Sequence, residues 1–283
     1  MGMKQCLLCG SYGQKVVFWE FEIPVFQCLN CQHVFSGHTQ ESHYEGYFDS
    51  IELNDEHLFW WNKAHQAMYE DFCQRFISNK SGKLLDVGCG LGFFLKKMEE
   101  YPKWQTIGYE LSSKAVTFAK EQLKLTHVFC ESVELASLEA DNFDIITLWD
   151  VIEHLPNPTT LLNCLHSLLK PQGFLFLHTP NIQVQLPKAY LKKCLKGMRS
   201  DIHYLEAKDH VHIYSPQTIK WLLENNGFRN IQLIHLHPNQ SISGKQYPFL
   251  TIAKNIWSTT ADKLEHFTKG KLNLDNLFVV AYK

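Results

Sequence analysis

Hydrophobic and polar positions alternate between two patterns over most of the chain. Short apolar runs that are typical of buried parallel strands recur at 84–87, 105–110, 127–130, 143–149, 174–179, 231–236 and 277–282. Between these runs, apolar residues are spaced three and four apart, which predicts amphipathic helices on the faces of a sheet. The alternation predicts a doubly wound, mostly parallel, seven-stranded α/β sheet whose last strand is antiparallel and ends the sheet.

The expected helices begin at residues that suit a helix N-terminus. Ser112, Asn157 and Ser215 each stand directly before a helical pattern and are expected to be N-caps. Pro158 follows at the first helical position, where its missing N–H costs no hydrogen bond. A further helix over about 54–77 is expected before the first strand.

A glycine-rich turn joins the first strand to its helix. Gly88, Gly90 and Gly92 occupy alternate positions there, so that the backbone can approach a ligand closely. The third glycine follows the second by two residues, whereas a dinucleotide loop has three. Asp86 precedes the turn, where a carboxylate would repel a pyrophosphate but suit an ammonium. Glu110 ends the next strand and is placed to accept both hydroxyls of a ribose.

This combination resembles the first motif and its acidic partner in class I S-adenosylmethionine-dependent methyltransferases, over roughly 84–228. The resemblance implies a Rossmann-like fold and S-adenosylmethionine as the cofactor. It implies that a helix before the first strand covers the cofactor, and that a loop after the third strand contacts the adenine. The implied cofactor-binding residues are Asp86, Gly88, Gly90, Gly92, Glu110, Leu111, Ser132, Val133 and Asp150.

Two later segments, 150–158 and 209–216, resemble the ubiquinone-type and sugar-type small-molecule O-methyltransferases. This resemblance implies that His154 lies at the methyl acceptor and that the region of Asp150 contacts the methionine amino group. The acceptors of this family are so varied that the resemblance names none of them.

Acidic and histidine side chains gather in these two segments. Asp150, Glu153 and His154 would share one side of a helical turn, and His210 and His212 return to the same sheet edge. Three interpretations are open. His154 or His212 acts as a general base, for which an unperturbed pKa of about 6.5 is suited. The group holds a divalent metal such as Mg²⁺, which would lower the pKa of an acceptor diol. The histidines are structural. Of the three, we expect the histidine base.

Four of the nine cysteines form two Cys-x-x-Cys pairs before the sheet. Cys6, Cys9, Cys28 and Cys31 flank a short strand-like segment, and a hairpin would place their thiolates around Zn²⁺ as a zinc ribbon. Such a site has no open position, so its expected role is structural. The alternative is four free cysteines in a disordered arm. Gln32 stands where the second knuckle would normally have glycine.

Composition and charge limit the class of protein. Hydrophobic residues make up 45% of the 283 residues, which suffices for a core, and no apolar run is long enough to span a membrane. The first residues do not form a signal peptide, and the remaining cysteines are scattered, so we expect reduced thiols in the cytoplasm. The formal net charge of -2 gives no general case for nucleic-acid binding.

The expected domains are a zinc ribbon over 1–40, a linker and cofactor-covering helix over 41–80, and the methyltransferase domain over 81–283. In the linker, Tyr44 and Tyr47 are either pocket-lining or ordinary packing residues.

Two segments interrupt the rhythm of the sheet. The first, 182–210, is either a solvated amphipathic helix or a lid over an anionic acceptor, because it carries Lys188, Lys192, Lys193, Lys196 and Arg199. The second, 247–268, is expected to be helical.

The sequence therefore predicts methyl transfer from S-adenosylmethionine to a small-molecule acceptor, at oxygen, with a histidine base. Two alternatives come from other classes. A nicotinamide-dependent oxidoreductase is disfavoured by Asp86 and the glycine spacing. A non-catalytic cofactor-binding module that recruits a partner through the ribbon is disfavoured by the intact set of motif residues.

Overall fold

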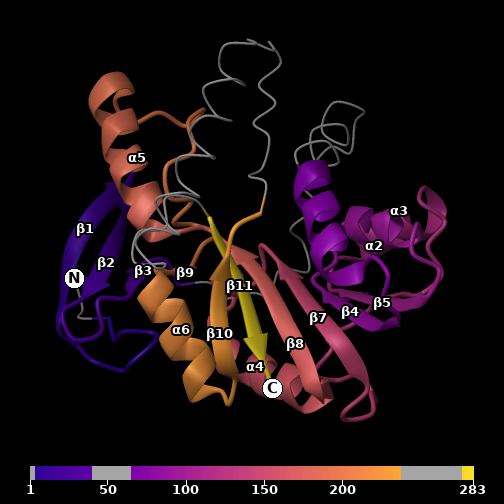
Figure 1. Cartoon of the computed structure of the whole chain (residues 1–283). Coiled ribbons are helices and arrows are strands. Elements are labelled where there is room, and N and C mark those ends of the chain that lie inside the picture. Colours follow the sequence, from indigo (N-terminus) through magenta and orange to yellow (C-terminus); the bar gives the residue numbers. More distant parts are fainter. Residues whose placement is uncertain (1–3, 40–64, 237–275) are drawn as a thin grey trace.

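The computed structural model describes residues 4–39, 65–236 and 276–283. A seven-stranded sheet with the order β10-β11-β8-β7-β4-β5-β6 forms its centre (Figure 1). The bounds are β4 Gly82–Val87, β5 Trp104–Glu110, β6 Val128–Cys130, β7 Phe143–Trp149, β8 Leu169–Thr179, β10 Arg229–Ile234 and β11 Leu277–Tyr282. All seven predicted strands are present, and the predicted Rossmann-like class I methyltransferase fold is confirmed.

The last strand differs from its expected place. β11 is antiparallel to β8 and β10, as predicted, but it lies between them and does not end the sheet. Residues 277–281 are all buried, which suits an interior strand. β10 has no fully buried residue, which suits the edge position that it takes.

Successive residues of the central strands face opposite sides of the sheet and enter two different cores. Leu84 lies in one core and Leu85 in the other, and the same alternation holds for neighbouring residues of β7, β8 and β11. The mostly aliphatic core lies under α4 (Pro158–Leu168) and α6 (Pro216–Asn225). The aromatic core, with Phe72 and Phe176 at its centre, lies under the helix at 65–77 and α2 (Phe93–Met98).

The helix starts largely follow the predicted caps. Ser112 accepts a hydrogen bond from a backbone N–H in the first turn of α3 (Ser113–Glu121). Ser215 forms a reciprocal capping box with Thr218 at the start of α6. Asn157 holds the N-cap position of α4, with Pro158 next, but its side chain makes no capping hydrogen bond. The helix before β4 ends in a π-helical turn, Cys73–Ile77.

A second, four-stranded sheet joins the amino-terminal segment to the part of the chain between α5 (Ile182–Lys196) and α6. It contains β1 (Gln14–Glu20), β2 (Ile23–Cys28), β3 (Val34–Ser36) and β9 (His212–Ile213) in that order. Its indigo strands lie beside α5 in Figure 1, on the side of the molecule away from α2 and α3. The amino-terminal hairpin therefore pairs with a strand that follows the fifth strand of the main sheet.

Several sequence predictions fall outside the described residues. These are the roles of Tyr44 and Tyr47, the first part of the helix at 54–77 and the segment at 247–268. In the ranges that the structure describes, no helix is both long and apolar enough to cross a bilayer.

Candidate active site

The glycine turn after β4 has the backbone conformation that its sequence predicts. Gly88, Gly90 and Gly92 all have positive φ angles, of 68°, 53° and 84°, which favour glycine. A Cβ atom at Gly88 would lie 2.6 Å from a methyl carbon of Val151. Any larger residue there would therefore push the turn away from the end of β7.

Glu110, at the end of β5, is fixed by this turn. One carboxylate oxygen accepts a hydrogen bond from the backbone N–H of Gly90 at 2.8 Å, and the other from Ser112 at 2.9 Å. Burial raises the pKa of Glu110, although these N–H groups favour the charged form. Each oxygen keeps a further lone pair for a ligand hydroxyl.

The residues expected around the adenine lie at the next strand end. Glu110 pairs with Cys130 across β5 and β6, so Leu111 and the segment with Ser132 and Val133 follow neighbouring strands. The Val133 side chain is buried in the aliphatic core, which leaves its backbone as the part available to a ligand.

Asp86 is a buried carboxyl group with an unused oxygen. Its side chain is 1% exposed, and Oδ1 accepts a hydrogen bond from the Thr147 hydroxyl at 2.7 Å. Oδ2 is buried and has no hydrogen-bond partner among the described residues. Burial raises the pKa of Asp86 to about 8. A ligand ammonium would supply both the missing hydrogen bond and the counter-charge, so the site fits the methionine end of the expected cofactor.

Asp150 lies at the end of β7 and is held by His178, a residue that the sequence analysis did not select. Nδ1 of His178 is 2.9 Å from Oδ1 of Asp150, and the His178 carbonyl accepts the Asp150 N–H at 3.1 Å. Burial would raise the pKa of Asp150, but His178 lowers it to about 2. Asp150 has a φ of 52°, so this pairing holds an unusual backbone conformation.

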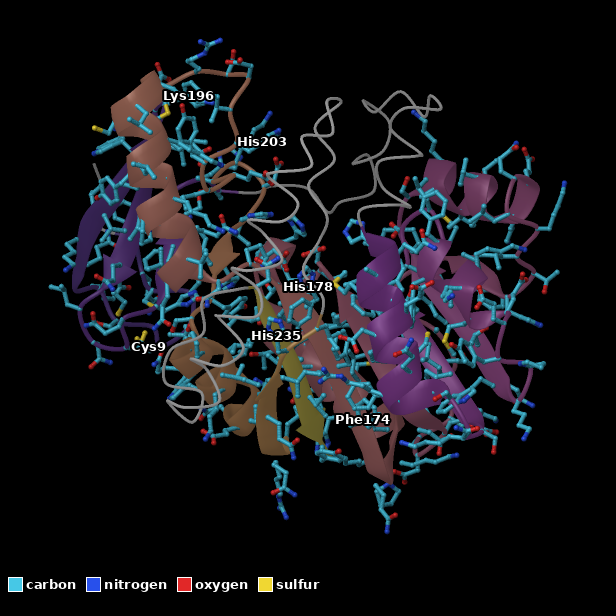
Figure 2. The ribbon with its side chains drawn as sticks, turned by 45° about the horizontal axis from the view of Figure 1, so that its top comes forward. Cys9, Phe174, His178, Lys196, His203 and His235 are labelled. Carbon is cyan, nitrogen blue, oxygen red and sulfur yellow. The ribbon has the colours of Figure 1, made fainter. Side chains whose placement is uncertain are left out.

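His178 is oriented by a second partner. The side-chain NH₂ of Asn276 lies 3.1 Å from its Nε2, and since an amide NH₂ only donates, the ring proton is on Nδ1, the nitrogen nearer Asp150. His65, from the helix that precedes β4, approaches the other carboxylate oxygen to 3.9 Å. Figure 2 places His178 near the middle of the molecule, further along the same strand as Phe174. No local sequence pattern marks His178, because it reaches Asp150 through the parallel register that sets it beside Trp149.

Glu153, His154 and His210 form a compact group directly after Asp150. Their ligand atoms lie within 4.8 Å of one another. The Thr179 hydroxyl donates to Oε2 of Glu153 at 3.0 Å, and the buried Oε1 finds no hydrogen-bond partner in the described parts of the chain. Nδ1 of His154 lies 3.0 Å from the Asp209 carbonyl. The structure thus brings together three of the five side chains that the sequence placed here.

Burial dominates the protonation of this group. It raises the pKa of Glu153 well above its usual range, with the charge of Asp150 adding to the effect. Burial, together with the nearby His210, also lowers the pKa of His154 to about 4. The pKa of His210 is lowered for the same reason. Both imidazoles are therefore neutral at pH 7.

His212 lies apart from this group. It is fully buried in β9, and its Nδ1 is 2.9 Å from Nε2 of His33 in the amino-terminal hairpin. Its ring stacks on Tyr214 with the centroids 5.4 Å apart. The structure therefore places His212 in the small sheet, against His33, whereas the sequence pattern predicts it beside His154.

The basic segment after β8 lies against the hairpin. α5 packs on Phe18 of β1, with the ammonium group of Lys193 5.1 Å above the Phe18 ring. Lys192 donates to the His203 carbonyl, and Arg199 forms two hydrogen bonds with Asp201. These three cations thus have partners in the protein, as on an amphipathic helix that packs on one face.

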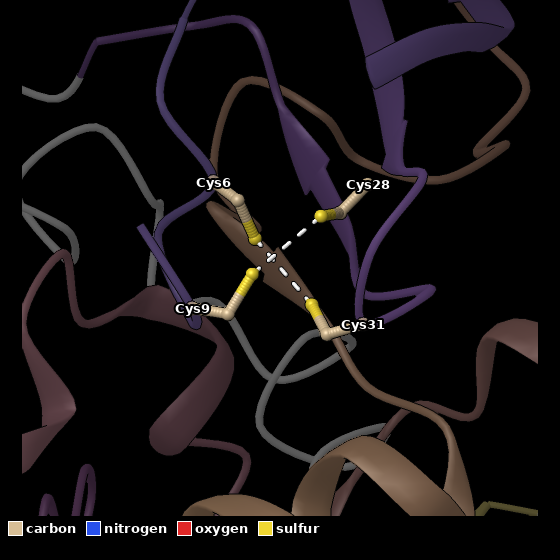
Figure 3. Close-up of side chains that lie close together, drawn as sticks. All are labelled: Cys6, Cys9, Cys28 and Cys31. Carbon is tan, nitrogen blue, oxygen red and sulfur yellow. Dashed lines mark hydrogen bonds between the residues drawn. The ribbon is translucent and has the colours of Figure 1, made fainter. Parts of the chain in front are cut away.

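The four cysteines of the two Cys-x-x-Cys pairs meet at one point (Figure 3). The sulfurs of Cys6 and Cys31 are 3.6 Å apart, as are those of Cys9 and Cys28, and the two contacts cross. Four sulfurs bound tetrahedrally at about 2.3 Å from a zinc would lie about 3.8 Å apart. The distances are too long for disulfides and fit a four-coordinate metal.

Both knuckles have the same backbone geometry despite their different sequences. The N–H of Gly10 donates to the Cys6 carbonyl at 2.9 Å, and that of Gln32 to the Cys28 carbonyl at 3.1 Å. Gly10 has a φ of 73° and Gln32 a φ of 61°. Gln32 thus takes the conformation of the usual glycine. Partial burial of Cys9 disfavours its thiolate, but hydrogen bonds from Ser11 and other neighbours lower its pKa to about 7.

The buried Asp86 generates a prediction for the cofactor-free protein. Its pKa is about 8 when folded and about 3.9 when unfolded, so the folded state binds more protons between these values. The free energy of unfolding should therefore fall as pH rises from 4 to 8. Asp86→Asn removes this charge and should raise the free energy of unfolding at pH 8.5 by a few kcal/mol, with little gain near pH 4.

Urea unfolding at several pH values measures this difference. Asp201→Asn, on an exposed ion pair, is the control and should leave the pH dependence unchanged. Parallel pH curves for Asp86→Asn and wild type would contradict the raised pKa.

Comparisons with known proteins identify the family of this fold. A family model described as a methyltransferase domain matches residues 60–233. The ubiquinone biosynthesis O-methyltransferase of Coxiella burnetii (strain Dugway 5J108-111) is 28% identical over 196 residues, covering 63% of this chain and 81% of that protein. The protein of the same name from Pseudoalteromonas translucida is 32% identical over 163 residues, covering 52% and 65%.

Solved structures share the fold at low sequence identity. Phosphoethanolamine N-methyltransferase 2 of Haemonchus contortus, solved with phosphomonomethylethanolamine and S-adenosylhomocysteine, has a TM-score of 0.58 at 15% identity and covers 88% of this chain and 63% of that chain. A methyltransferase from Archaeoglobus fulgidus has a TM-score of 0.52 at 17% identity, covering 81% and 100%. The chain belongs to the class I S-adenosylmethionine-dependent methyltransferases, and S-adenosylmethionine is its methyl donor.

Proposed function

We propose that the protein methylates a hydroxyl group of a small molecule, with S-adenosylmethionine bound at the carboxyl ends of β4 and β5. The observation that carries this proposal is the group of Glu153, His154 and His210, which follows β7 at the same edge of the sheet. It offers proton acceptors close to where the methyl donor would lie. The curated relatives named above act in ubiquinone biosynthesis as O-methyltransferases, which supports transfer to oxygen.

At the cofactor, the protein's own residues bind and orient. Oδ2 of Asp86 is available to the methionine ammonium, and the Glu110 carboxylate to the ribose hydroxyls. The positive-φ glycines let the backbone of the turn approach the ligand. The sulfonium of bound S-adenosylmethionine supplies the electrophilic methyl carbon, so the remaining task is to orient the acceptor and remove its proton.

His154 is proposed as the group that takes this proton. Because the Asp209 carbonyl can only accept, the hydrogen of the His154 ring is on Nδ1 and the lone pair is on Nε2. The low pKa keeps this imidazole neutral at pH 7. His212 has no direct part in this proposal, since its ring contacts His33 and Tyr214.

A divalent metal at the same group is the second candidate. Nδ1 of His210 lies 3.2 Å from the Leu205 carbonyl, so the ring hydrogen is on Nδ1. Nε2 of His210 then carries the lone pair and lies 3.6 Å from the Glu206 carboxylate, a further possible ligand. Two imidazole nitrogens and the Glu153 carboxylate then form a set of metal ligands. A cation here would lower the pKa of an acceptor hydroxyl.

One experiment tests the reaction and another its base. Wild-type enzyme with S-adenosylmethionine should convert a phenolic acceptor, from a panel headed by catechol, to a product heavier by one methyl group. His154→Ala should then lower turnover roughly 10²-fold or more, because general-base catalysis is lost, while cofactor affinity stays unchanged. Under the base mechanism, added Mg²⁺ or Mn²⁺ should have no effect.

The outcomes separate the two candidates. Turnover that requires Mg²⁺ or Mn²⁺ and disappears in both Glu153→Ala and His210→Ala would replace the base mechanism by the metal mechanism. Full activity of His154→Ala would reject both. Metal is added to zinc-loaded enzyme, because a chelator could also strip the cysteine site.

The ribose role of Glu110 has its own test. Charge-assisted hydrogen bonds contribute roughly 1.5–3 kcal/mol, so Glu110→Ala should weaken S-adenosylmethionine binding about tenfold or more. Calorimetry measures this affinity, with the exposed Glu121→Ala as the matched control. Equal affinities for wild type and Glu110→Ala would remove the role. Preferential binding of NAD by wild type would instead favour the oxidoreductase alternative.

Zinc is proposed at Cys6, Cys9, Cys28 and Cys31, with 1–40 as a ribbon, 41–80 as linker and covering helix, and 81–283 as the catalytic domain. Purified protein should contain one zinc per chain, since four thiolates at these distances suit its tetrahedral coordination. Double substitution of Cys28 and Cys31 by serine should abolish it, whereas serine at the exposed Cys130 and Cys194 should not. Unchanged zinc content after the first pair of substitutions would refute the site.

The cysteines also support the proposed location. All nine are free, which suits a reducing compartment such as the cytoplasm. An anionic acceptor has less support, because Lys192, Lys193 and Arg199 are engaged within the protein.

A further inference from the structure

We infer that the amino-terminal hairpin, β1 to β3, helps to build the acceptor site. Glu20, the last residue of β1, is the positioning residue for the segment 205–213. This inference rests on the proposed function, because it assigns the hairpin to the group that would take the acceptor proton. It differs from a purely structural role for the ribbon, since it names the part of the catalytic domain that the ribbon holds.

Glu20 is a nearly buried carboxylate whose partners all lie in the later chain. It is 7% exposed and accepts hydrogen bonds from the backbone N–H groups of Leu205 at 3.3 Å, Glu206 at 3.3 Å and Ala207 at 2.8 Å. Three consecutive N–H groups that converge on one carboxylate form an anion-binding turn. Glu206 has a φ of 55°, so this turn has a conformation that a non-glycine residue rarely adopts alone.

Strand β3, which pairs with β9, fixes the other end of the same segment. The Ser36 hydroxyl donates to the Ala207 carbonyl at 2.5 Å, and the Ser36 N–H donates to the Val211 carbonyl at 3.0 Å. Phe35 pairs with His212 in the antiparallel register of β3 and β9. The hairpin thus holds the segment 205–213 at both of its ends.

The middle of this segment contacts or contributes to the acceptor group, which is Glu153, His154 and His210. The Asp209 carbonyl accepts the Nδ1 hydrogen of His154 and so fixes its ring and tautomer. His210 enters the same group, and its own Nδ1 bonds to the Leu205 carbonyl. Leu205 is therefore held by Glu20 through its N–H and holds His210 through its carbonyl. The path from Glu20 to the acceptor group passes through two hydrogen bonds and one residue.

The cysteine site also supports the segment 205–213, because it holds the strands of the hairpin that contact this segment. Cys28 is the last residue of β2, and its N–H donates to the carbonyl of His33, just before β3. Loss of the metal would free the end of β2 and the start of β3, which carries Ser36. Zinc removal should therefore loosen the segment 205–213, and not only the ribbon itself.

Hydrogen exchange tests the inference without any acceptor. In Glu20→Gln, one N–H acceptor becomes an NH₂ donor that opposes the converging N–H groups, so the amides of 205–207 should exchange about tenfold faster or more. The imidazole NMR signals of His154 and His210 should shift, whereas that of His166, in the last turn of α4 beside Phe228, should not. Glu22→Gln, on the exposed tip of the same hairpin, should change neither.

The activity measurement uses catechol as the acceptor and compares the effect on catechol turnover with the effect on cofactor affinity. Glu20→Gln should lower kcat/KM for catechol at least tenfold, while the Kd for S-adenosylmethionine and the zinc content stay within twofold of wild type. Zinc-depleted wild type should show the same faster exchange at 205–213. If Glu20→Gln does not fold, Ser36→Ala tests the same segment from the other strand.

The outcomes are distinguishable. Unchanged exchange at 205–207 and unchanged histidine signals in a folded Glu20→Gln or Ser36→Ala protein would overturn the inference, as would zinc loss that leaves 205–213 unaffected. An equal loss of catechol activity and cofactor affinity would indicate general destabilisation and also overturn it. If wild type methylates no phenol, the proposed function fails, but the exchange and NMR measurements still decide the positioning role.

Discussion

The buried carboxyl groups at the carboxyl ends of the parallel strands are the constraint on which the site depends. Removing a carboxylate from water is costly unless hydrogen bonds or a counter-charge replace the lost hydration. Glu110 receives two backbone N–H groups and Asp150 receives His178, so both can stay charged. Asp86 receives only the Thr147 hydroxyl and is therefore left with a raised pKa. Of these three acids, Asp86 is the one without a charged partner or a backbone donor among the described residues, and it is the one suited to a cationic ligand group.

The same parallel arrangement explains why the site is assembled from distant parts of the sequence. Neighbouring parallel strands end at one edge, so β4, β5, β7 and β8 present their last residues together. The strands themselves are held by two cores that use alternate residues, aliphatic on one side and aromatic on the other. The strands stop at this edge, so the remaining side chains of the site must come from other segments. Here the helix at 65–72 and the segment 205–213, which itself pairs with the hairpin, bring side chains to that edge.

Local patterns predicted the strands, most caps, the glycine turn and the four cysteines, because each depends on residues close together in the sequence. The contacts of His178 and Glu20 could not be predicted in this way. His178 reaches Asp150 only through the register of β7 against β8, and Glu20 meets backbone N–H groups, which leave no trace in side-chain sequence. His212 shows the converse. Its spacing from His210 would put both side chains on one face of a strand, but β9 begins only at His212. His210 lies in the turn before it, and only His210 joins His154.

The basicity of His154 affects how the hydroxyl proton of the methyl acceptor can be removed. An imidazole of pKa about 4, as at His154, is neutral and available, but it is a weak base. Moving a proton to it from a phenol of pKa about 10 is uphill by about 8 kcal/mol, since each pKa unit corresponds to about 1.4 kcal/mol. Closure of the site around a bound acceptor cannot remove this gap by further burial, because burial lowers the imidazole pKa. Either the acceptor is unusually acidic, or a positive charge beside it lowers its pKa. The cofactor's sulfonium supplies one such charge, and a cation held by Glu153, His154 and His210 would supply another.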